Sequence, residues 1–393
     1  MKHLTLRKVD KFLGAFLVST FRYLSLLLGV ILHREHDITK IKKSITVIKM
    51  LGGGSIFIAL PSLLAIRKKY PDIKMIFVGQ KSSIYYAELT GIFDEHVEIR
   101  IDSFMGLFVS SIRALIHIFR TDLTIDLEIH SKMTSLFSLF SCAKNRLGFY
   151  VDSLYWQKGI LTHALYFNDT GPIYIYYKQI AGLLNAHVGK PKDVYKHLVK
   201  HNEFKLNHPK KNVHALSLGP FCSELGQERE FSAMQWSKII AAHNYTSLKK
   251  IVILGGKADV KKAAELTQKL QNCNQEFTVV NLVGQLTLHE SIQAILQTDK
   301  FMSIDSGLNH IVRFLNMNIS SYWGPTNPMS RLGDAYTLKE EVHYKQIFCS
   351  PCVHLSFNAP CRGNNICMQQ FTESYDEHIV YKGWPIHVKE IGR

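Results

Sequence analysis

The chain has 393 residues, enough for two or three domains with buried cores, which excludes a small scaffold held together by disulfides. Hydrophobic residues make up 46% of the sequence and charged residues 20%, so the composition excludes intrinsic disorder and collagen-like repeats. Lysine and arginine number 47 against 32 acidic residues, and the resulting net charge of +15 predicts an anionic partner. Nucleic acid, acidic lipid and phosphorylated sugars all fit that charge.

The first feature along the chain is a mostly apolar run from Phe12 to Leu32, about as long as a membrane-spanning helix. Basic residues precede it, at Lys2, Arg7, Lys8 and Lys11. Small or polar residues recur within it at helical spacing, at Ser19, Arg22, Ser25 and Gly29. We therefore expect residues 1–40 to form an amphipathic helix lying in a membrane interface. A full span and a helix packed on the protein itself are the alternatives, and the lack of a small-x-small cleavage site argues against a cleaved signal.

From residue 44, short apolar runs alternate with helical patterns, which is typical of parallel strands covered by helices. Strands are predicted at 44–50, 74–78, 96–99 and 123–129, and helices at 56–69 and 107–120. A loop of Gly52, Gly53 and Gly54 joins the first strand to its helix. Glycines there allow a bound group to approach the backbone, but they also suit a plain tight turn.

The polar stretch 182–211, rich in Lys, His and Asn, indicates a connection between two domains, because the alternation restarts after it. Strands are predicted at 213–218, 250–254, 278–281, 300–304 and 319–323, and helices at 232–243, 258–270 and 288–297. The expected fold is therefore two doubly wound α/β domains in tandem, 41–200 and 201–393.

Polar residues follow the predicted strand 300–304, where an open α/β sheet binds ligands. Asp305, Ser306 and Gly307 open a predicted helix whose free amides favour a diphosphate, and His310 adds a hydrogen bond or a charge. A simple helix cap by Asp305 or Ser306 is the alternative. Gly324-Pro325-Thr326 closes the next strand and is expected beside the same crevice.

Four of the seven cysteines lie in one late segment, 349–367, as Cys349, Cys352, Cys361 and Cys367. Their spacing allows a tetrahedral zinc site with four thiolates, although only the first pair has zinc-knuckle spacing. Two disulfides or four reduced thiols are the other possibilities. The remaining cysteines are scattered, which indicates a reducing cytosol rather than a disulfide framework.

Four blocks together resemble glycosyltransferase family 9, the lipopolysaccharide heptosyltransferase family, from about residue 44 to 370. The first block is Lys49-Met50-Leu51-Gly52-Gly53-Gly54-Ser55 with Pro61 to Arg67, and the second is Asp122 to Leu127 with Ser131, Lys132 and Arg146 to Phe149. The third block begins at Leu254-Gly255-Gly256, continues through Asn281 to Gly284, Leu286 and Glu290, and ends at Asp305-Ser306-Gly307 and His310. The fourth block is Trp323 to Pro328 with Cys349 to Cys352. Their order and spacing make chance agreement improbable.

The resemblance implies a GT-B fold, in which two Rossmann-like domains face a cleft. The N-terminal domain then receives the acceptor at the loop of Gly53 and Gly54, and the C-terminal domain holds a nucleotide-diphosphate sugar. It implies inverting transfer without a required metal or cofactor. The donor-binding positions implied by the resemblance are Arg229, Glu290, Asp305, Ser306, Gly307, His310 and Thr326.

One position departs from the family pattern. Ser55 stands where the family's first Gly-rich loop ends in an Asp proposed as the catalytic base. A serine hydroxyl is not a competent base near pH 7 unless another group activates it. Asp126 and Glu128, at a predicted strand end, are the candidate replacements, but a structural cap and a solvated charge explain them equally well.

We therefore expect a glycosyltransferase that moves heptose or a related sugar to a lipopolysaccharide-like or lipid-linked acceptor, in the cytoplasm and peripherally on the inner membrane. The alternative is a catalytically impaired nucleotide-sugar-binding homologue, because Ser55 replaces the expected base. Nucleic-acid binding ranks last, since only the charge supports it and no aromatic-basic motif is present.

Overall fold

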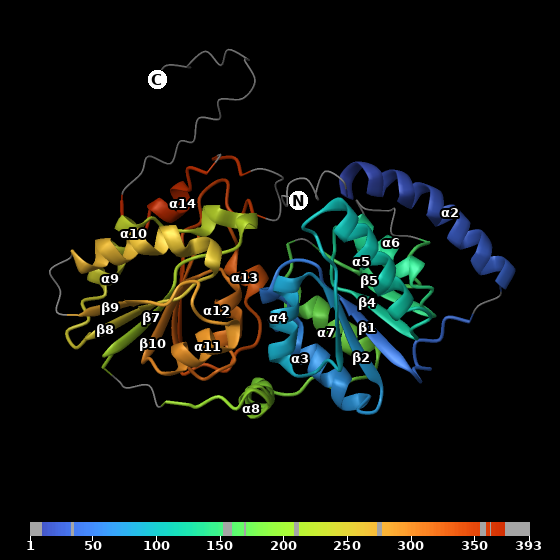
Figure 1. The fold of residues 1–393 in the computed structure, drawn as a ribbon, viewed down its shortest axis with the longest axis horizontal. Coiled ribbons are helices and arrows are strands. Elements are labelled where there is room, and N and C mark those ends of the chain that lie inside the picture. The colour runs from blue at the N-terminus through green and yellow to red at the C-terminus, as the bar shows by residue number, and fades with distance from the viewer. Residues whose placement is uncertain are drawn as a thin grey trace, which may run out of the picture.

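The computed structural model describes residues 10–32, 35–151, 159–168, 170–207, 212–272, 277–353, 359–361 and 363–373. It contains two six-stranded sheets in which every paired strand is parallel, and the two domains built on them lie side by side in Figure 1. Their strand orders are β3-β2-β1-β4-β5-β6 and β12-β11-β10-β7-β8-β9.

The N-terminal sheet is centred on β1, whose apolar residues pack against both neighbours. Ile45 pairs with Met75 and Leu123, and all three are fully buried. The strands are β1 Ser44–Ile48, β2 Lys74–Gly79, β3 Glu95–Glu98, β4 Leu123–Asp126, β5 Asn145–Tyr150 and β6 His163–Tyr166. The helices are α3 Gly53–Lys69, α4 Lys81–Thr90, α5 Phe104–His117, α6 Lys132–Phe140, α7 Ile173–Leu183 and α8 Pro191–Asn202.

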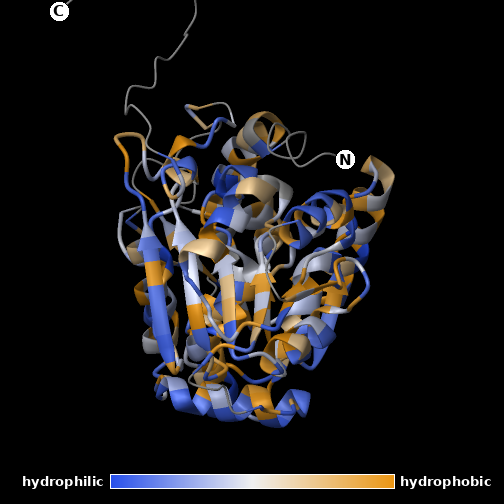
Figure 2. Ribbon diagram, turned by 90° about the vertical axis from the view of Figure 1, so that its left-hand side faces the viewer, coloured by the Kyte–Doolittle hydropathy of each residue, from blue (hydrophilic) through white to orange (hydrophobic). Residues whose placement is uncertain are grey.

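The C-terminal sheet repeats this design around β10. Its strands are β7 Ala215–Gly219, β8 Lys250–Ile253, β9 Thr278–Asn281, β10 Lys300–Ile304, β11 Asn318–Trp323 and β12 Lys339–Tyr344. The helices are α9 Ala233–Ala242, α10 Val260–Gln271, α11 Leu288–Leu296, α12 Gly307–Val312, α13 Pro328–Arg331 and α14 Ile366–Gln369, with 3₁₀ turns η3 Glu224–Arg229 and η4 Lys257–Asp259. Figure 2 shows a largely hydrophilic strand at one edge, which agrees with the charged sequence of β12. Polar edge strands resist pairing with other chains.

The strand order reverses between β1 and β4 in one sheet and between β10 and β7 in the other. In open α/β sheets, ligands bind outside the carboxyl ends of strands at this switch point. The Gly-rich loop follows β1, and Asp305 directly follows β10. The fold therefore places the two motifs at the switch points of their sheets.

The stretch 182–211, predicted from the sequence as a connection between two domains, contains a helix that the sequence analysis did not predict. Helix α8 occupies its middle, begins with Pro191 at the first turn, and buries Val194 and Leu198. Only these two of its twelve residues are buried, so the apolar period is too sparse to stand out from the sequence.

The N-terminal run forms a π-helical turn, η1 Asp10–Gly14, followed by helix α2 Ala15–Leu32. Val18 of α2 is 1% exposed and packs against Leu136 of α6 and Ile160. Among the helices in the described ranges, none is both long and apolar enough to cross a membrane. Lys2, Arg7 and Lys8, the basic residues noted before this run, lie outside the described residues.

Candidate functional site

The Gly-rich loop of the first domain packs directly on the Asp305 loop of the second. A Cβ added to Gly54 would lie 2.7 Å from Cδ2 of His310 and 3.3 Å from Cα of Gly307. Helices α3 and α12, which these loops open, are in contact. The structure thus brings Gly54 together with Gly307 and His310, which follow it by about 250 residues in the sequence.

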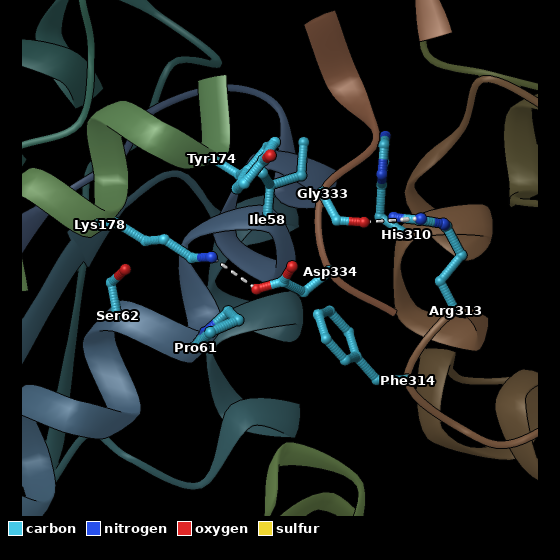
Figure 3. Close-up of a pocket in the computed structure, with 10 residues that line it drawn as sticks. All are labelled: Ile58, Pro61, Ser62, Tyr174, Lys178, His310, Arg313, Phe314, Gly333 and Asp334. Atoms are coloured by element: carbon cyan, nitrogen blue, oxygen red, sulfur yellow. Dashed lines mark hydrogen bonds and ion pairs between the residues drawn. The ribbon is translucent and has the colours of Figure 1, made fainter. Parts of the chain in front are cut away.

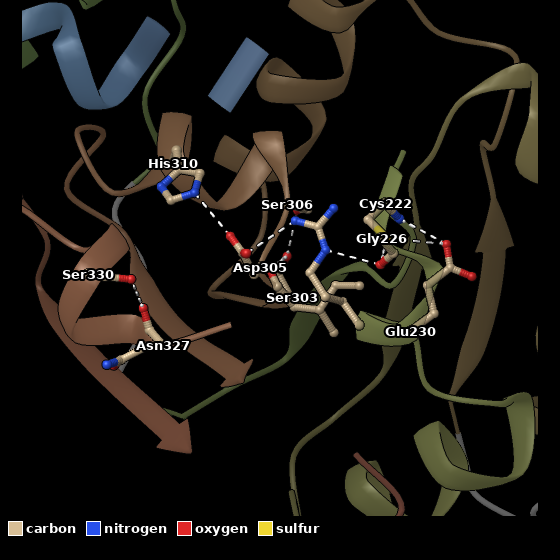
Figure 4. Close-up of polar contacts among 11 residues, drawn as sticks. Cys222, Gly226, Glu230, Ser303, Asp305, Ser306, His310, Asn327 and Ser330 are labelled. Carbon is tan, nitrogen blue, oxygen red and sulfur yellow. Dashed lines mark hydrogen bonds and ion pairs between the residues drawn. The ribbon is translucent and has the colours of Figure 1, made fainter. Parts of the chain in front are cut away.

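Asp305 is the centre of a buried polar cluster on the C-terminal side (Figure 4). Its Oδ2 accepts a hydrogen bond from Nη1 of Arg229 at 3.1 Å, and its Oδ1 lies 3.2 Å from Nε2 of His310. Burial favours the neutral acid, but Arg229 and His310 hold the pKa of Asp305 well below its usual range. Burial also lowers the pKa of His310, against the pull of Asp305. The cluster is therefore an ionised carboxylate between an arginine and a histidine that burial keeps neutral.

Arg331, at the end of α13, is a functional candidate that the sequence analysis missed. Burial lowers its pKa, while the nearby Asp305 and the Tyr177 side chain of α7 oppose this change. An arginine remains charged despite such a shift. Arg331 thus adds a second guanidinium between the domains. The Asn327-Pro328 start of its helix is a recognisable signal, because Asn caps helices and Pro suits the first helical turn.

Thr326 and His310 each bury a polar atom that makes no hydrogen bond within the described part of the chain, Oγ1 of Thr326 and Nδ1 of His310. Both amide atoms of the fully buried Asn309 are in the same position. Buried polar groups normally have partners, and those without them mark places where a ligand or water completes the set. The sequence analysis had not selected the Asn309 side chain.

Two predicted donor residues, Glu290 and Ser306, make hydrogen-bonding contacts within the chain. Glu290 accepts from the backbone N and Oγ1 of Thr287, each at 2.8 Å, and so caps α11; these bonds lower its pKa. The Ser306 hydroxyl lies 3.1 Å from that of Ser303. Helix α12 has only six residues, so its dipole is small. The side chains of Arg229 and Arg331 therefore supply most of the positive charge near Asp305.

On the N-terminal side, Glu128 holds the start of the Gly-rich loop. Its Oε1 accepts from the backbone N of Met50 at 2.9 Å and of Leu51 at 2.8 Å, and its Oε2 lies 3.0 Å from Nζ of Lys49. Burial lowers the pKa of Lys49, but Glu128 outweighs this and the net shift is upward. Glu128 is thus committed to an ion pair and to two backbone amides.

Asp126, at the end of β4, has a different environment. It is 1% exposed, its Oδ1 accepts from the backbone N of Glu128 at 2.9 Å, and its Oδ2 makes no hydrogen bond within the described residues. Burial raises the pKa of Asp126 to about 7. Of the two candidate carboxylates, only Asp126 combines an uncommitted oxygen with a pKa suited to a base near neutral pH.

Ser55 lies in the first turn of α3, beside Tyr177 of α7. Burial raises the pKa of Tyr177, while Lys49, Arg331 and the Ser55 hydroxyl act against this rise. Tyr177 is thus surrounded by groups from both domains. No described carboxylate hydrogen-bonds to Ser55.

A small pocket between the domains is lined by α3 and α7 on one side and by the segment from His310 to Asp334 on the other (Figure 3). Nζ of Lys178 lies 2.7 Å from Oδ2 of Asp334 across it. Nη2 of Arg313 donates to the carbonyl of Gly333 at 2.9 Å. The Lys178–Asp334 ion pair joins the two domains, whereas the Arg313–Gly333 hydrogen bond orders the C-terminal wall of the pocket.

The segment with the late cysteines packs against the loop Gly324-Pro325-Thr326 that follows β11. A Cβ on Gly324 would lie 2.9 Å from Sγ of Cys367, so this segment packs against Gly324-Pro325-Thr326. Burial and the neighbouring thiols raise the pKa of Cys352 to about 11 and that of Cys367 to about 12. Within the described residues, no three His, Cys, Asp or Glu side chains are arranged to hold a metal ion.

Comparison with known proteins agrees with this geometry. Residues 173–361 match the family model of glycosyltransferase family 9 (heptosyltransferase). Lipooligosaccharide heptosyltransferase 2 of Haemophilus influenzae is 29% identical over 110 residues, which are 28% of this chain and 31% of that protein. The matched stretch is therefore about a third of the length of this relative.

Two solved structures share the fold over most of both chains. The E. coli ADP-heptose lipopolysaccharide heptosyltransferase II has a TM-score of 0.57 at 18% identity and covers 84% of this chain and 99% of its own. The E. coli heptosyltransferase WaaC with ADP has a TM-score of 0.60 at 13% identity and covers 84% and 98%. The GT-B fold and the family resemblance predicted from the sequence are confirmed.

Proposed function

We propose that the chain transfers a sugar from a nucleotide diphosphate to a lipid-linked or lipopolysaccharide-like glycan, starting from the match of residues 173–361 to the family model of glycosyltransferase family 9. The observation that carries the proposal is the buried Arg229–Asp305–His310 cluster, which adjoins the Gly-rich loop of the other domain. The proposed domains are an acceptor-side unit, 41–200, and a donor-side unit, 201–393. The named relatives act with heptose donors, so ADP-heptose is the first donor to test.

The proposed donor site places the diphosphate among Arg229, Arg331, His310 and Thr326. As the bond from the anomeric carbon to the diphosphate breaks, negative charge grows on the departing oxygen. Fixed guanidinium groups in a site with little water stabilise that charge, which is the usual source of most of the rate gain in such a transfer. Asp305 is a positioning residue that holds Arg229 and His310 in place.

The proposed acceptor step is an inverting single displacement. The acceptor hydroxyl attacks the anomeric carbon from the face opposite the diphosphate, and its proton passes to a base. Asp126 supports this role through its raised pKa and uncommitted Oδ2. Glu128 does not, because the pair with Lys49 and two backbone amides occupy its carboxylate.

The proposed location is the cytoplasmic face of the inner membrane, with peripheral attachment. The apolar surface of α2 and the net charge of +15 support attachment to an anionic bilayer.

The test is a thermal-shift titration of the full chain with ADP, UDP, GDP and CMP, followed by transfer assays with the matching sugar donor. Ligands that bind only the folded state raise the melting temperature. We expect one nucleotide to stabilise the wild type and to lose this effect in Asp305→Asn. Asp102→Asn, which alters an exposed pair with Arg100, is the matched control and should behave as wild type.

Each outcome decides between the candidates. Stabilisation with sugar transfer supports the enzyme, whereas stabilisation without transfer to any lipid-linked acceptor supports the impaired homologue that Ser55 suggests. Equal stabilisation of the wild type and Asp305→Asn would remove the Asp305 cluster from the donor site.

A further inference from the structure

Helix α5 presents an apolar stripe to the outside of the N-terminal domain. Phe104, Met105, Phe108, Ile112 and Ile116 are between 42% and 72% exposed, and Phe119 just beyond the helix is 55% exposed. Several of them recur every four residues and so lie on one face. The opposite face is packed, with Ser110 and Ala114 buried. Single exposed apolar side chains are ordinary, but a full stripe of large ones marks a contact surface.

Helix α2 presents a second apolar face. Phe16, Tyr23, Leu27, Val30 and Ile31 are between 58% and 71% exposed, although Val18 is buried against the domain. The two polar residues on the outer side do not leave free hydroxyls. Ser19 donates to the carbonyl of Ala15 at 2.9 Å, and Thr20 to that of Phe16 at 3.2 Å. Such bonds to the preceding turn lower the cost of placing hydroxyl groups in an apolar phase.

Helix α6 joins the two faces. Its Phe137 packs with Ala114 and Ile118 beside α5, and its Phe140 packs edge-to-face on Phe21 of α2 with ring centroids 4.9 Å apart. Phe140 is itself 39% exposed. Figure 1 shows α2, α6 and α5 beside one another at the outer edge of the N-terminal domain. The two apolar faces therefore form one surface, which we call the α2–α5 face.

The charges on this face select the partner. Neither 15–32 nor 104–117 contains an acidic residue, and α5 carries the exposed Arg113 and His117, with Arg120 following. The nearest acids at the ends of α5 are paired, Asp102 with Arg100 at 2.8 Å and Glu95 with His117 at 2.6 Å. Large apolar side chains beside basic ones, with the nearest acids held in ion pairs, fit the interface of an anionic bilayer.

The position of the face relates it to the cleft. Helices α5 and α6 begin after the carboxyl ends of β3 and β4, on the side of the sheet where the Gly-rich loop lies. The start of α6 is tied to the start of the N-terminal helical run, because Asp10 Oδ1 accepts from Ser131 Oγ and the backbone N of Met133, each at 2.9 Å. The end of the α2–α5 face therefore borders the acceptor side of the cleft.

We propose that α5, together with α2, docks on an anionic lipid surface and so presents the acceptor side of the cleft to lipid-linked glycans. The link to the acceptor rests on the proposed function, whereas docking itself does not. Helix α5 is then an attachment element in addition to α2. The sequence analysis assigned membrane contact to the N-terminal run alone.

The test is co-sedimentation of the full chain with vesicles of phosphatidylcholine alone or mixed with phosphatidylglycerol. We expect wild type to bind the anionic vesicles, and Phe108→Ser with Ile116→Ser to reduce the bound fraction at least fivefold although α2 is intact. The matched control is Leu338→Ser with Val342→Ser, which changes exposed apolar residues of the distant C-terminal domain and should bind as wild type. Arg113→Gln with Arg120→Gln should weaken binding mainly to the anionic vesicles.

Unchanged vesicle binding by the α5 variant would overturn the proposal. So would an α5 variant that converts a dimer to a monomer while it binds vesicles as wild type, because the face would then be an interface between copies. The nucleotide thermal shift, measured on the same variants, shows whether the donor site is still intact when vesicle binding changes. A lost vesicle interaction with an intact nucleotide shift supports docking whatever the sugar transferred.

Discussion

Tyr86 of α4 fills the space that a Cβ on Gly307 would need. The nearest atom to that position is the Tyr86 hydroxyl oxygen, and the same ring lies where a Cβ on Gly53 would be. One tyrosine therefore packs between the Gly-rich loop of the first domain and the Asp305 loop of the second. Burial raises its pKa to about 12, so the hydroxyl is neutral at working pH. The glycines permit the domains to close on this ring.

Gly307→Ala should prevent that closure and reduce kcat/KM for transfer by tenfold or more, because a methyl group cannot share the volume of the Tyr86 ring. Steady-state kinetics with the donor identified by thermal shift would measure the loss. Adding Tyr86→Ser should restore part of the activity, since it removes the ring. Gly182→Ala in α7 is the matched control, because nothing lies within 4 Å of the added Cβ. If Gly307→Ala transfers sugar at the wild-type rate, this packing has no role in closure.

Glu128→Gln should lower the free energy of unfolding by about 3 kcal/mol, because it leaves the buried Lys49 ammonium without its carboxylate. The glutamine retains an oxygen for the amides of Met50 and Leu51, so the loss of stability reports the missing negative charge rather than missing hydrogen bonds. Urea unfolding followed by circular dichroism would measure it. Replacing both members, by Lys49→Met and Glu128→Gln, should recover most of the stability.

The matched control for this pair is Glu373→Gln, whose partner Lys238 lies 3.4 Å away with both side chains at least 40% exposed. Solvent screens such a pair, and its loss should cost less than about 1 kcal/mol. Equal losses of unfolding free energy in Glu128→Gln and Glu373→Gln would show that the charge of Glu128 does not stabilise the start of the Gly-rich loop.

The parts of the fold that the sequence predicted are those with strong local patterns. Strand β10 and its Asp305 loop, β1 and its Gly-rich loop, and helix α11 were all expected within a few residues of their observed bounds. The two strands are short, mostly buried runs, and α11 has buried residues at helical spacing after a capping threonine. Helices α6 and α7 were not predicted. Each is short, and α6 alternates serine with apolar residues, which gives no clear period at 3.6.

The site could be predicted only where motif and function coincide. Asp305 and His310 are five residues apart, and the structure brings them together as their common motif suggested. The neighbours Ser55 and Tyr177 are more than 120 residues apart on different helices, so no local pattern reveals their approach. Glu290 shows the opposite case. Its place in a Thr-x-x-Glu sequence is a capping-box signal, and capping is the role it has in the structure.

The pH dependence of stability should identify Asp126. Its pKa is about 7 in the folded protein and 3.8 in the reference state, so the folded chain holds an extra proton between these values. Stability therefore falls as pH rises from about 4 to 7, by at most about 4 kcal/mol. Asp126→Asn cannot ionise, and its free energy of unfolding should lack this decline. Urea unfolding of both proteins at pH 5, 6, 7 and 8 would measure the difference.

The same group should control the rate if it is the base. For the wild type, kcat/KM should rise with pH and level off near 7, where Asp126 becomes ionised, and Asp126→Asn should lose most activity at every pH. A stability difference that is constant from pH 5 to 8 would contradict the raised pKa. A wild-type pH profile of kcat/KM in Asp126→Asn would show that Asp126 is not the base. It would leave the raised pKa of Asp126 untouched.

The thiols of Cys352 and Cys367 should be unreactive in the folded protein. Their pKa values of about 11 and 12 keep them protonated at pH 7.5, and both are only 5% exposed. Alkylating reagents attack the thiolate, so iodoacetamide should modify these two positions at least a hundredfold more slowly in buffer than in urea, as followed by peptide mass spectrometry. Tetrahedral zinc binding would give a different result. Adding a chelator would then lower the melting temperature and speed the alkylation of both thiols, whereas the arrangement of the described residues leads us to expect no change in either.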